Sequence, residues 1–70
     1  MGTGFIICNN KVKNVPVFEQ ARVNSDEIYE IQNGTKVLLT GGEYSYCGFS
    51  LLEIMEPING WVFKSVVKLE

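Results

Sequence analysis

The chemistry open to this chain of 70 residues is narrow, because the chain contains no histidine. Without histidine, the common Ser–His and Cys–His nucleophile arrangements cannot form. A facing pair of carboxylates would still suffice for glycosidase-type chemistry. The carboxylates available for it are Glu19, Asp26, Glu27, Glu30, Glu43, Glu53 and Glu56. They are spread over expected turns and strand surfaces, and a domain this small has little room for a deep cleft. The sequence therefore predicts no catalytic residue and no enzyme.

Cysteine offers no metal site. Cys8 and Cys47 lie far apart in the chain and form no Cys-x-x-Cys pair, so no metal and no cofactor are predicted. Two alternatives stay open for these thiols. They could form a disulfide between the first strand and the middle of the domain, or both could be buried as free thiols, since free Cys behaves as a small hydrophobe.

The aromatic side chains are better candidates for a site, and one that binds. Tyr44 and Tyr46 alternate around Ser45 beside Gly41-Gly42, in an expected hairpin loop. Two tyrosines on one side of a loop can form a platform for a peptide or a sugar. Trp61 follows a turn signal and is expected to be only partly buried. Ligand contact and plain packing both remain open for these three. The phenylalanines expected in the core, because large apolar side chains bury first, are Phe5, Phe49 and Phe63.

Composition indicates one globular domain over residues 1–70, with 46% hydrophobic and 20% charged residues. The net charge of −2 provides no positive field for a phosphate backbone, so no nucleic-acid partner is predicted. No apolar run approaches the roughly 20 residues of a membrane helix, so no membrane insertion is predicted. Residues 1–8 lack the basic region of a signal peptide.

Short apolar runs separated by turn signals predict an all-β fold. Asn33-Gly34 and Asn59-Gly60 are expected as tight turns, because both residue types tolerate positive φ. Gly41-Gly42 is expected to break the strand over 35–40, and residues 2–4 to be flexible. Pro16 predicts an edge position or an irregular start for the strand over 12–18, since proline cannot donate to a ladder.

Residues 24–32 are ambiguous. Asn24 and Glu27 have the spacing of a capping box, and Ile28 and Ile31 would share one face of a two-turn helix. A helix this short is marginal without packing. Helix and strand are therefore both open on local propensity.

A series of motifs narrows the fold. In chain order they are Val15-Pro16-Val17-Phe18, Gly34-Thr35-Lys36-Val37, Phe49-Ser50-Leu51-Leu52 and Gly60-Trp61-Val62. Over residues 15–70 the chain resembles the bacterial Src-homology-3 (SH3) domain family. The resemblance implies a small SH3-like β-barrel of five to six short strands, with a strand at 28–31 and a 3₁₀ turn at 64–66 before the last strand.

The same resemblance implies a non-catalytic module that binds bacterial cell-wall peptide, as the targeting part of an envelope protein or hydrolase. The residues it implies as ligand contacts are Phe18, Glu19, Tyr44, Tyr46 and Trp61. If the chain is part of a larger exported protein, the resemblance implies the cell envelope or the outside of the cell; otherwise the cytoplasm is expected. An intracellular adaptor or small subunit that binds a peptide segment of a protein is the alternative. Weak homodimerisation through exposed strand edges is a third.

Overall fold

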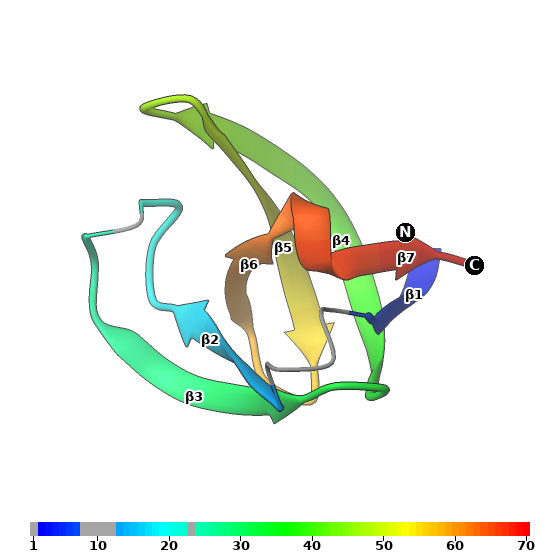
Figure 1. Ribbon diagram of the computed structural model, residues 1–70. Coiled ribbons are helices and arrows are strands. Elements are labelled where there is room, and N and C mark those ends of the chain that lie inside the picture. The colour runs from blue at the N-terminus through cyan, green and yellow to red at the C-terminus, as the bar shows by residue number, and fades with distance from the viewer. Residues whose placement is uncertain (1, 8–12, 23) are drawn as a thin grey trace.

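Seven strands form one antiparallel sheet in the computed structural model, which describes residues 2–7, 13–22 and 24–70, except the side chain of Tyr46. Along the sheet the strands follow the order β3-β2-β6-β5-β4-β1-β7, and the sheet bends around a core (Figure 1). Among the described strands it is an open sheet, with β3 and β7 at its edges. The bounds are β1 Gly2–Ile6, β2 Asn14–Phe18, β3 Glu27–Gln32, β4 Lys36–Tyr46, β5 Phe49–Glu56, β6 Gly60–Phe63, the 3₁₀ turn η1 Lys64–Val66 and β7 Val67–Leu69.

The all-β prediction is confirmed, and so is the 3₁₀ turn before the last strand. The predicted number of five to six strands is too low, and the expected flexibility of residues 2–4 is wrong. Those residues begin β1, which pairs with β4 on one side and with β7 on the other. The pairing with β7 requires glycine at position 4. A β carbon there would lie only 2.9 Å from the carbonyl oxygen of Lys68, which is too close for a side chain.

Residues 27–32 form a strand, which settles the helix-or-strand alternative. β3 pairs with β2 from Asn14↔Gln32 to Phe18↔Glu27, and Ile31 enters the core with 2% of its surface exposed. β2 is not an edge strand, since β6 lies on its other side. However, β6 pairs with β2 only at Phe18↔Trp61 among the described residues, so no neighbour requires the N–H that Pro16 lacks.

Gly41-Gly42 does not end a strand, contrary to expectation. β4 continues through both glycines, and its register against β5 shifts between Leu39 and Glu43. Gly41 has a φ of 95°, which only glycine adopts readily. The two glycines therefore form a bulge that bends the strand rather than breaking it.

The hairpin turn lies at Cys47-Gly48 instead. Both residues have positive φ, 51° and 83°, which is the pattern of a type I′ turn, and Tyr46 pairs with Phe49 across it. Cys47 is an exposed free thiol, so neither of the two alternatives, burial or a disulfide, is found at this position. Cys8 lies outside the described residues.

The two Asn-Gly dipeptides have different roles. At Asn33-Gly34 the predicted tight turn is confirmed, because Gly34 has a φ of 93° and Thr35 N–H donates to the Gln32 carbonyl at 3.2 Å. At Asn59-Gly60 neither residue has a positive φ, and Gly60 is the first residue of β6. There the glycine is needed for close packing against β2.

The core is aliphatic. The expectation that Phe5, Phe49 and Phe63 fill it is wrong: Phe49 is 50% exposed, and the other two are half-buried at the edge of the packing. Branched side chains that alternate along the short strands occupy the interior instead. The core residues are Ile6, Val15, Val17, Ile31, Val37, Leu39, Leu52, Ile54 and Val62.

Candidate functional site

Three neighbouring strands carry a row of large side chains on the face away from this core. Tyr44 on β4 pairs with Leu51 on β5, and Leu51 pairs with Phe63 on β6. Directly opposed residues share one face of a sheet, so these side chains are neighbours. Leu51 is fully buried although it is not part of the main core. It thus forms the base of an outer layer whose exposed members are aromatic.

A second row runs beside the first. Glu53 on β5 pairs with Trp61 on β6, and Trp61 pairs with Phe18 on β2. On β4 the corresponding place belongs to Gly42, where a β carbon would lie 3.3 Å from Cβ of Glu53. Because glycine has no side chain there, a hollow opens between Tyr44 and Trp61.

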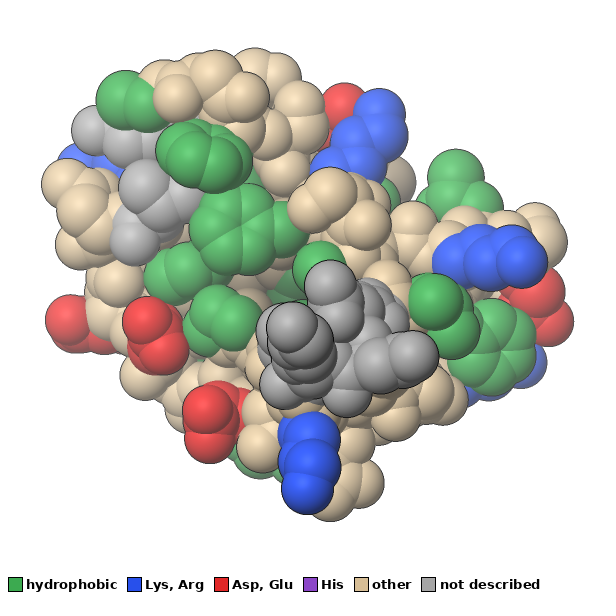
Figure 2. Space-filling view, in the orientation of Figure 1, with side chains coloured by type: hydrophobic (Ala, Val, Ile, Leu, Met, Phe, Trp, Pro, Cys, Tyr) green, Lys and Arg blue, Asp and Glu red, His purple; other side chains and the backbone are tan. Residues whose placement is uncertain are grey.

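This hollow is a cleft of about 320 Å³, called here the Tyr44–Trp61 cleft. One wall comes from β4 and β6, and the other from the loop between β2 and β3. Its lining residues are Gln20, Ala21, Arg22, Gly42, Glu43, Tyr44 and Trp61. Figure 2 shows hydrophobic side chains grouped on the face between the β4–β5 hairpin and this loop.

The loop wall is held by hydrogen bonds within the loop. Glu19 N–H donates to the Asp26 carbonyl at 2.8 Å, and this bond joins the two ends of the loop. The Ser25 hydroxyl lies 2.8 Å from the Arg22 carbonyl oxygen and 3.1 Å from that of Gln20. The Arg22 guanidinium also donates to the Gln20 side-chain carbonyl. These bonds hold Gln20 and Arg22 in place opposite the aromatic wall.

The carboxylates nearest the aromatic wall already have partners within the protein. Lys64 Nζ lies 3.0 Å from Glu43 Oε2 at the rim. Glu53 accepts a hydrogen bond of 2.8 Å from the Thr40 hydroxyl and one of 3.3 Å from the Asn59 amide. The cleft therefore presents aromatic faces and loop polar groups, with no unpaired carboxylate in its β-strand wall.

The aromatic layer extends beyond the cleft toward the β4–β5 turn. Phe63 packs edge-on against Phe18, with ring centroids 5.5 Å apart, and Phe49 packs against Phe63 at 5.6 Å. Phe49, Phe63 and Lys64 border a second hollow of about 310 Å³. Phe18 is the buried aromatic side chain of this layer.

The sequence-predicted site residues separate into three groups. Tyr44 and Trp61 line one cleft, and the expected partial burial of Trp61 is confirmed. Phe18 is 3% exposed and so offers almost no surface to a ligand, while Glu19 is exposed but outside the lining. Tyr46 lies on β4 and not in a loop, and its side chain is outside the described part of the structure.

Sequence reasoning missed two parts of the Tyr44–Trp61 cleft: the wall formed by the loop between β2 and β3, and the space left by Gly42. The only signals for them were the glycine pair, interpreted as a strand break, and the single arginine of the chain, Arg22.

No group of three His, Cys, Asp or Glu side chains in the described residues could hold a metal ion. In the same residues, no helix has the length and apolar character needed to span a membrane.

Comparison with protein-family models, with curated proteins and with solved structures finds no match to this chain.

Proposed function

We propose that this chain is a non-catalytic binding module with the SH3-like barrel architecture of the bacterial family, and that the Tyr44–Trp61 cleft binds a peptide. The proposal depends above all on one observation: two of the five residues chosen from the sequence as ligand contacts, Tyr44 and Trp61, line the same cleft.

Several fold features support the barrel architecture. A 3₁₀ turn at Lys64–Val66 separates β6 from β7, and the long strand β4 is bent by its glycine bulge. β4 pairs with β1 over residues 36–39, before the bulge, and with β5 on both sides of the bulge. Strand bending at a bulge is the device by which small sheets curl toward closure.

The cleft suits a peptide better than a reaction. Tyrosine and tryptophan combine a large apolar face with one polar group, which explains their enrichment at contact sites. The carboxylates nearest to the aromatic wall, Glu43 and Glu53, are engaged by Lys64, Thr40 and Asn59. Through these contacts the two carboxylates stabilise the fold, which favours a non-catalytic role for them.

The first ligand to test is the bacterial cell-wall peptide, as stem peptide or cross-bridge, in an envelope protein or hydrolase. The purified domain is co-sedimented with insoluble peptidoglycan, and amide chemical shifts are followed with soluble stem peptides. We expect co-sedimentation, with shifts at Tyr44, Trp61 and the loop residues Gln20–Arg22. Tyr44→Ala and Trp61→Ala should each weaken binding about tenfold or more, as contact aromatics do.

Tyr29→Ala is the matched control, because Tyr29 is 47% exposed but lies outside the cleft. If peptidoglycan leaves the amide shifts of the cleft residues unchanged, the proposal of wall targeting is wrong.

The second candidate function is an intracellular adaptor that accepts a peptide segment of another protein in the same cleft. Shifts at Tyr44 and Trp61 with peptide segments of intracellular proteins, and none with stem peptides, would support this candidate.

A further inference from the structure

A second surface, independent of the Tyr44–Trp61 cleft, lies along β3. This strand is at one end of the sheet order, with β2 on one side and no strand on the other among those described. An edge strand exposes a row of backbone N–H and C=O groups that can pair with another chain.

The register shows which backbone groups face outward. Asn33 N–H donates to the carbonyl of Lys13, and Ile31 and Tyr29 follow Asn33 at the same two-residue spacing opposite β2. Hydrogen-bonded and non-bonded positions alternate in antiparallel pairs, so Ile31 and Tyr29 direct their N–H and C=O groups toward β2. Glu30 then directs its own outward, consistent with its position opposite Pro16, which has no N–H to give.

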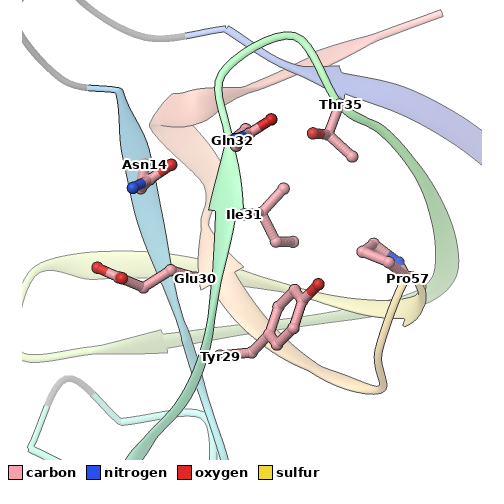
Figure 3. A pocket seen from close by; sticks show the side chains of 7 residues that line it. All are labelled: Asn14, Tyr29, Glu30, Ile31, Gln32, Thr35 and Pro57. Atoms are coloured by element: carbon pink, nitrogen blue, oxygen red, sulfur yellow. The ribbon is translucent and has the colours of Figure 1, made fainter.

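A cleft of about 380 Å³ borders this edge. Figure 3 shows Tyr29, Ile31, Thr35 and Pro57 on one side of β3, with Glu30 and Asn14 on the other. Tyr29 is 47% exposed, and its ring and Pro57 present apolar surface next to the strand. An added strand could therefore also place a side chain against these two residues.

β3 carries two unpaired carboxylates. Glu27 and Glu30 lie on the strand and are exposed. Neither forms an ion pair within the described residues. Lys36 and Lys64 are each paired with another glutamate, Glu70 and Glu43. Figure 2 shows acidic side chains over the region of β3.

The opposite edge differs in charge. β7 carries Lys68 as its only charged residue, and the Lys36–Glu70 pair lies nearby. The open edge of β3 is thus the one with an unpaired negative field, which attracts cations and repels acidic chains.

We infer that the β3 edge binds a cationic peptide segment in extended conformation. The segment pairs with the outward backbone groups of Glu30, directs its basic side chains to Glu27 and Glu30, and packs an apolar side chain against Tyr29 and Pro57. Main-chain hydrogen bonds provide the affinity and the carboxylates select the charge, as in other cases of strand addition.

The test uses three synthetic peptides and the whole chain. The first alternates lysine and valine, the second alternates glutamate and valine, and the third repeats the first with proline in place of its central valine. Amide shifts and isothermal titration are compared at about 0.05 M and about 0.5 M salt. We expect the lysine peptide to bind at β3 and weaken at high salt, and the other two not to bind.

Two variants separate charge from backbone pairing. Glu30→Gln should weaken binding of the lysine peptide about two- to fivefold, the range of one exposed charge pair. Glu30→Pro also removes the outward N–H without removing a bond to β2, and should abolish binding. Its folding is checked by the amide spectrum, and the proline-containing peptide tests the same point if the variant does not fold.

Tyr29→Ala should reduce binding, while Tyr44→Ala, in the other cleft, should not. Equal binding of the acidic peptide or of the proline-containing peptide would overturn the inference. Loss of lysine-peptide binding in Tyr44→Ala but not in Tyr29→Ala would overturn it as well. A dimer through β3, detected by sedimentation and unaffected by the lysine peptide, would show that the edge pairs with a second copy instead.

Discussion

Gly60 lies directly against Val17: a β carbon on Gly60 would be 2.4 Å from Cγ1 of Val17. The same β carbon would be 3.0 Å from the carbonyl oxygen of Phe18. The contact occurs where β6 meets β2, next to the pair Phe18↔Trp61. The absence of a side chain at Gly60 therefore allows two halves of the sheet to join.

Gly60→Ala should lower the free energy of unfolding by about 2–3 kcal/mol, because the new methyl group must displace a β-branched core residue and a backbone carbonyl. Urea unfolding followed by tryptophan fluorescence measures it, since Trp61 is the next residue. Gly2→Ala is the matched control, because a β carbon at Gly2 meets nothing within 4 Å. Equal stability of the two variants would contradict the close approach.

Cys47 is the only described residue other than glycine with a positive φ. A side chain in this region costs roughly 1 kcal/mol, and asparagine tolerates it better than cysteine. Cys47→Asn should therefore raise the free energy of unfolding by about 0.5–1 kcal/mol. Thermal unfolding under reducing conditions measures the change. Cys47→Val should act in the opposite direction, and a stabilising valine would show that the turn has another conformation.

The Glu53 carboxylate links three segments of chain. It accepts a hydrogen bond from the Thr40 hydroxyl and another from the Asn59 amide, which also donates to the Ile54 carbonyl at 3.0 Å. Thr40→Val should cost about 1–2 kcal/mol, the range for a hydrogen bond to a charged group in a partly buried site. Thr35→Val is its control in the same urea experiment, because the Thr35 hydroxyl makes no hydrogen bond within the described residues. A loss no larger than that of the control would mean that the bond contributes nothing.

The pKa of Glu70 is lowered, first by the hydrogen bond from the Thr3 hydroxyl and then by the charge of Lys36. A carboxyl with a depressed pKa in the folded state stabilises that state above its unfolded pKa. This contribution is lost as the pH falls through the lower, folded value. Titration of the Glu70 carboxyl carbon by NMR should show a pKa below that of an ordinary glutamate.

Thr3→Val and Lys36→Met should each raise the pKa of Glu70 back toward its usual range, because each removes a contact that lowers it. The Glu70 side chain is exposed, so its titration should have little effect on the overall unfolding curve. An unchanged pKa in both variants would contradict the assigned contacts.

The fold class could be predicted because its signals are local. The turn at Asn33-Gly34 depends on the φ of one glycine, and the spacing of short apolar runs is typical of strands. The segment over 24–32 could not be decided in this way. Its capping-box pattern favours a helix, but the pairing of β3 with β2 and the burial of Ile31 favour a strand. Such long-range pairing overrides weak local propensity.

The site was predicted only in part, because only some of its residues are indicated by a local sequence pattern. Tyr44 and Trp61 are aromatic residues near glycines, a visible pattern, and they line one cleft. The burial of Phe18 depends on its packing against Phe63, 45 residues further along the chain, which no local pattern indicates. Gly42 was predicted to break the strand. Its role in the structure is to leave space beside Glu53, and this role depends on the register of β5, which the sequence does not reveal.

The pairing of β1 with β7 also constrains the order in which the molecule can assemble. Gly4 pairs with Leu69 and Ile6 with Val67, so one edge of the sheet joins segments more than 60 residues apart. Such a topology has high contact order, and the cost of closing this long loop must be met before the contact stabilises anything. During synthesis on the ribosome, β1 must therefore wait for residues 67–69 before its second partner exists. Until then the Gly2–Ile6 segment has an open side, and a chaperone or a neighbouring nascent chain could bind there first.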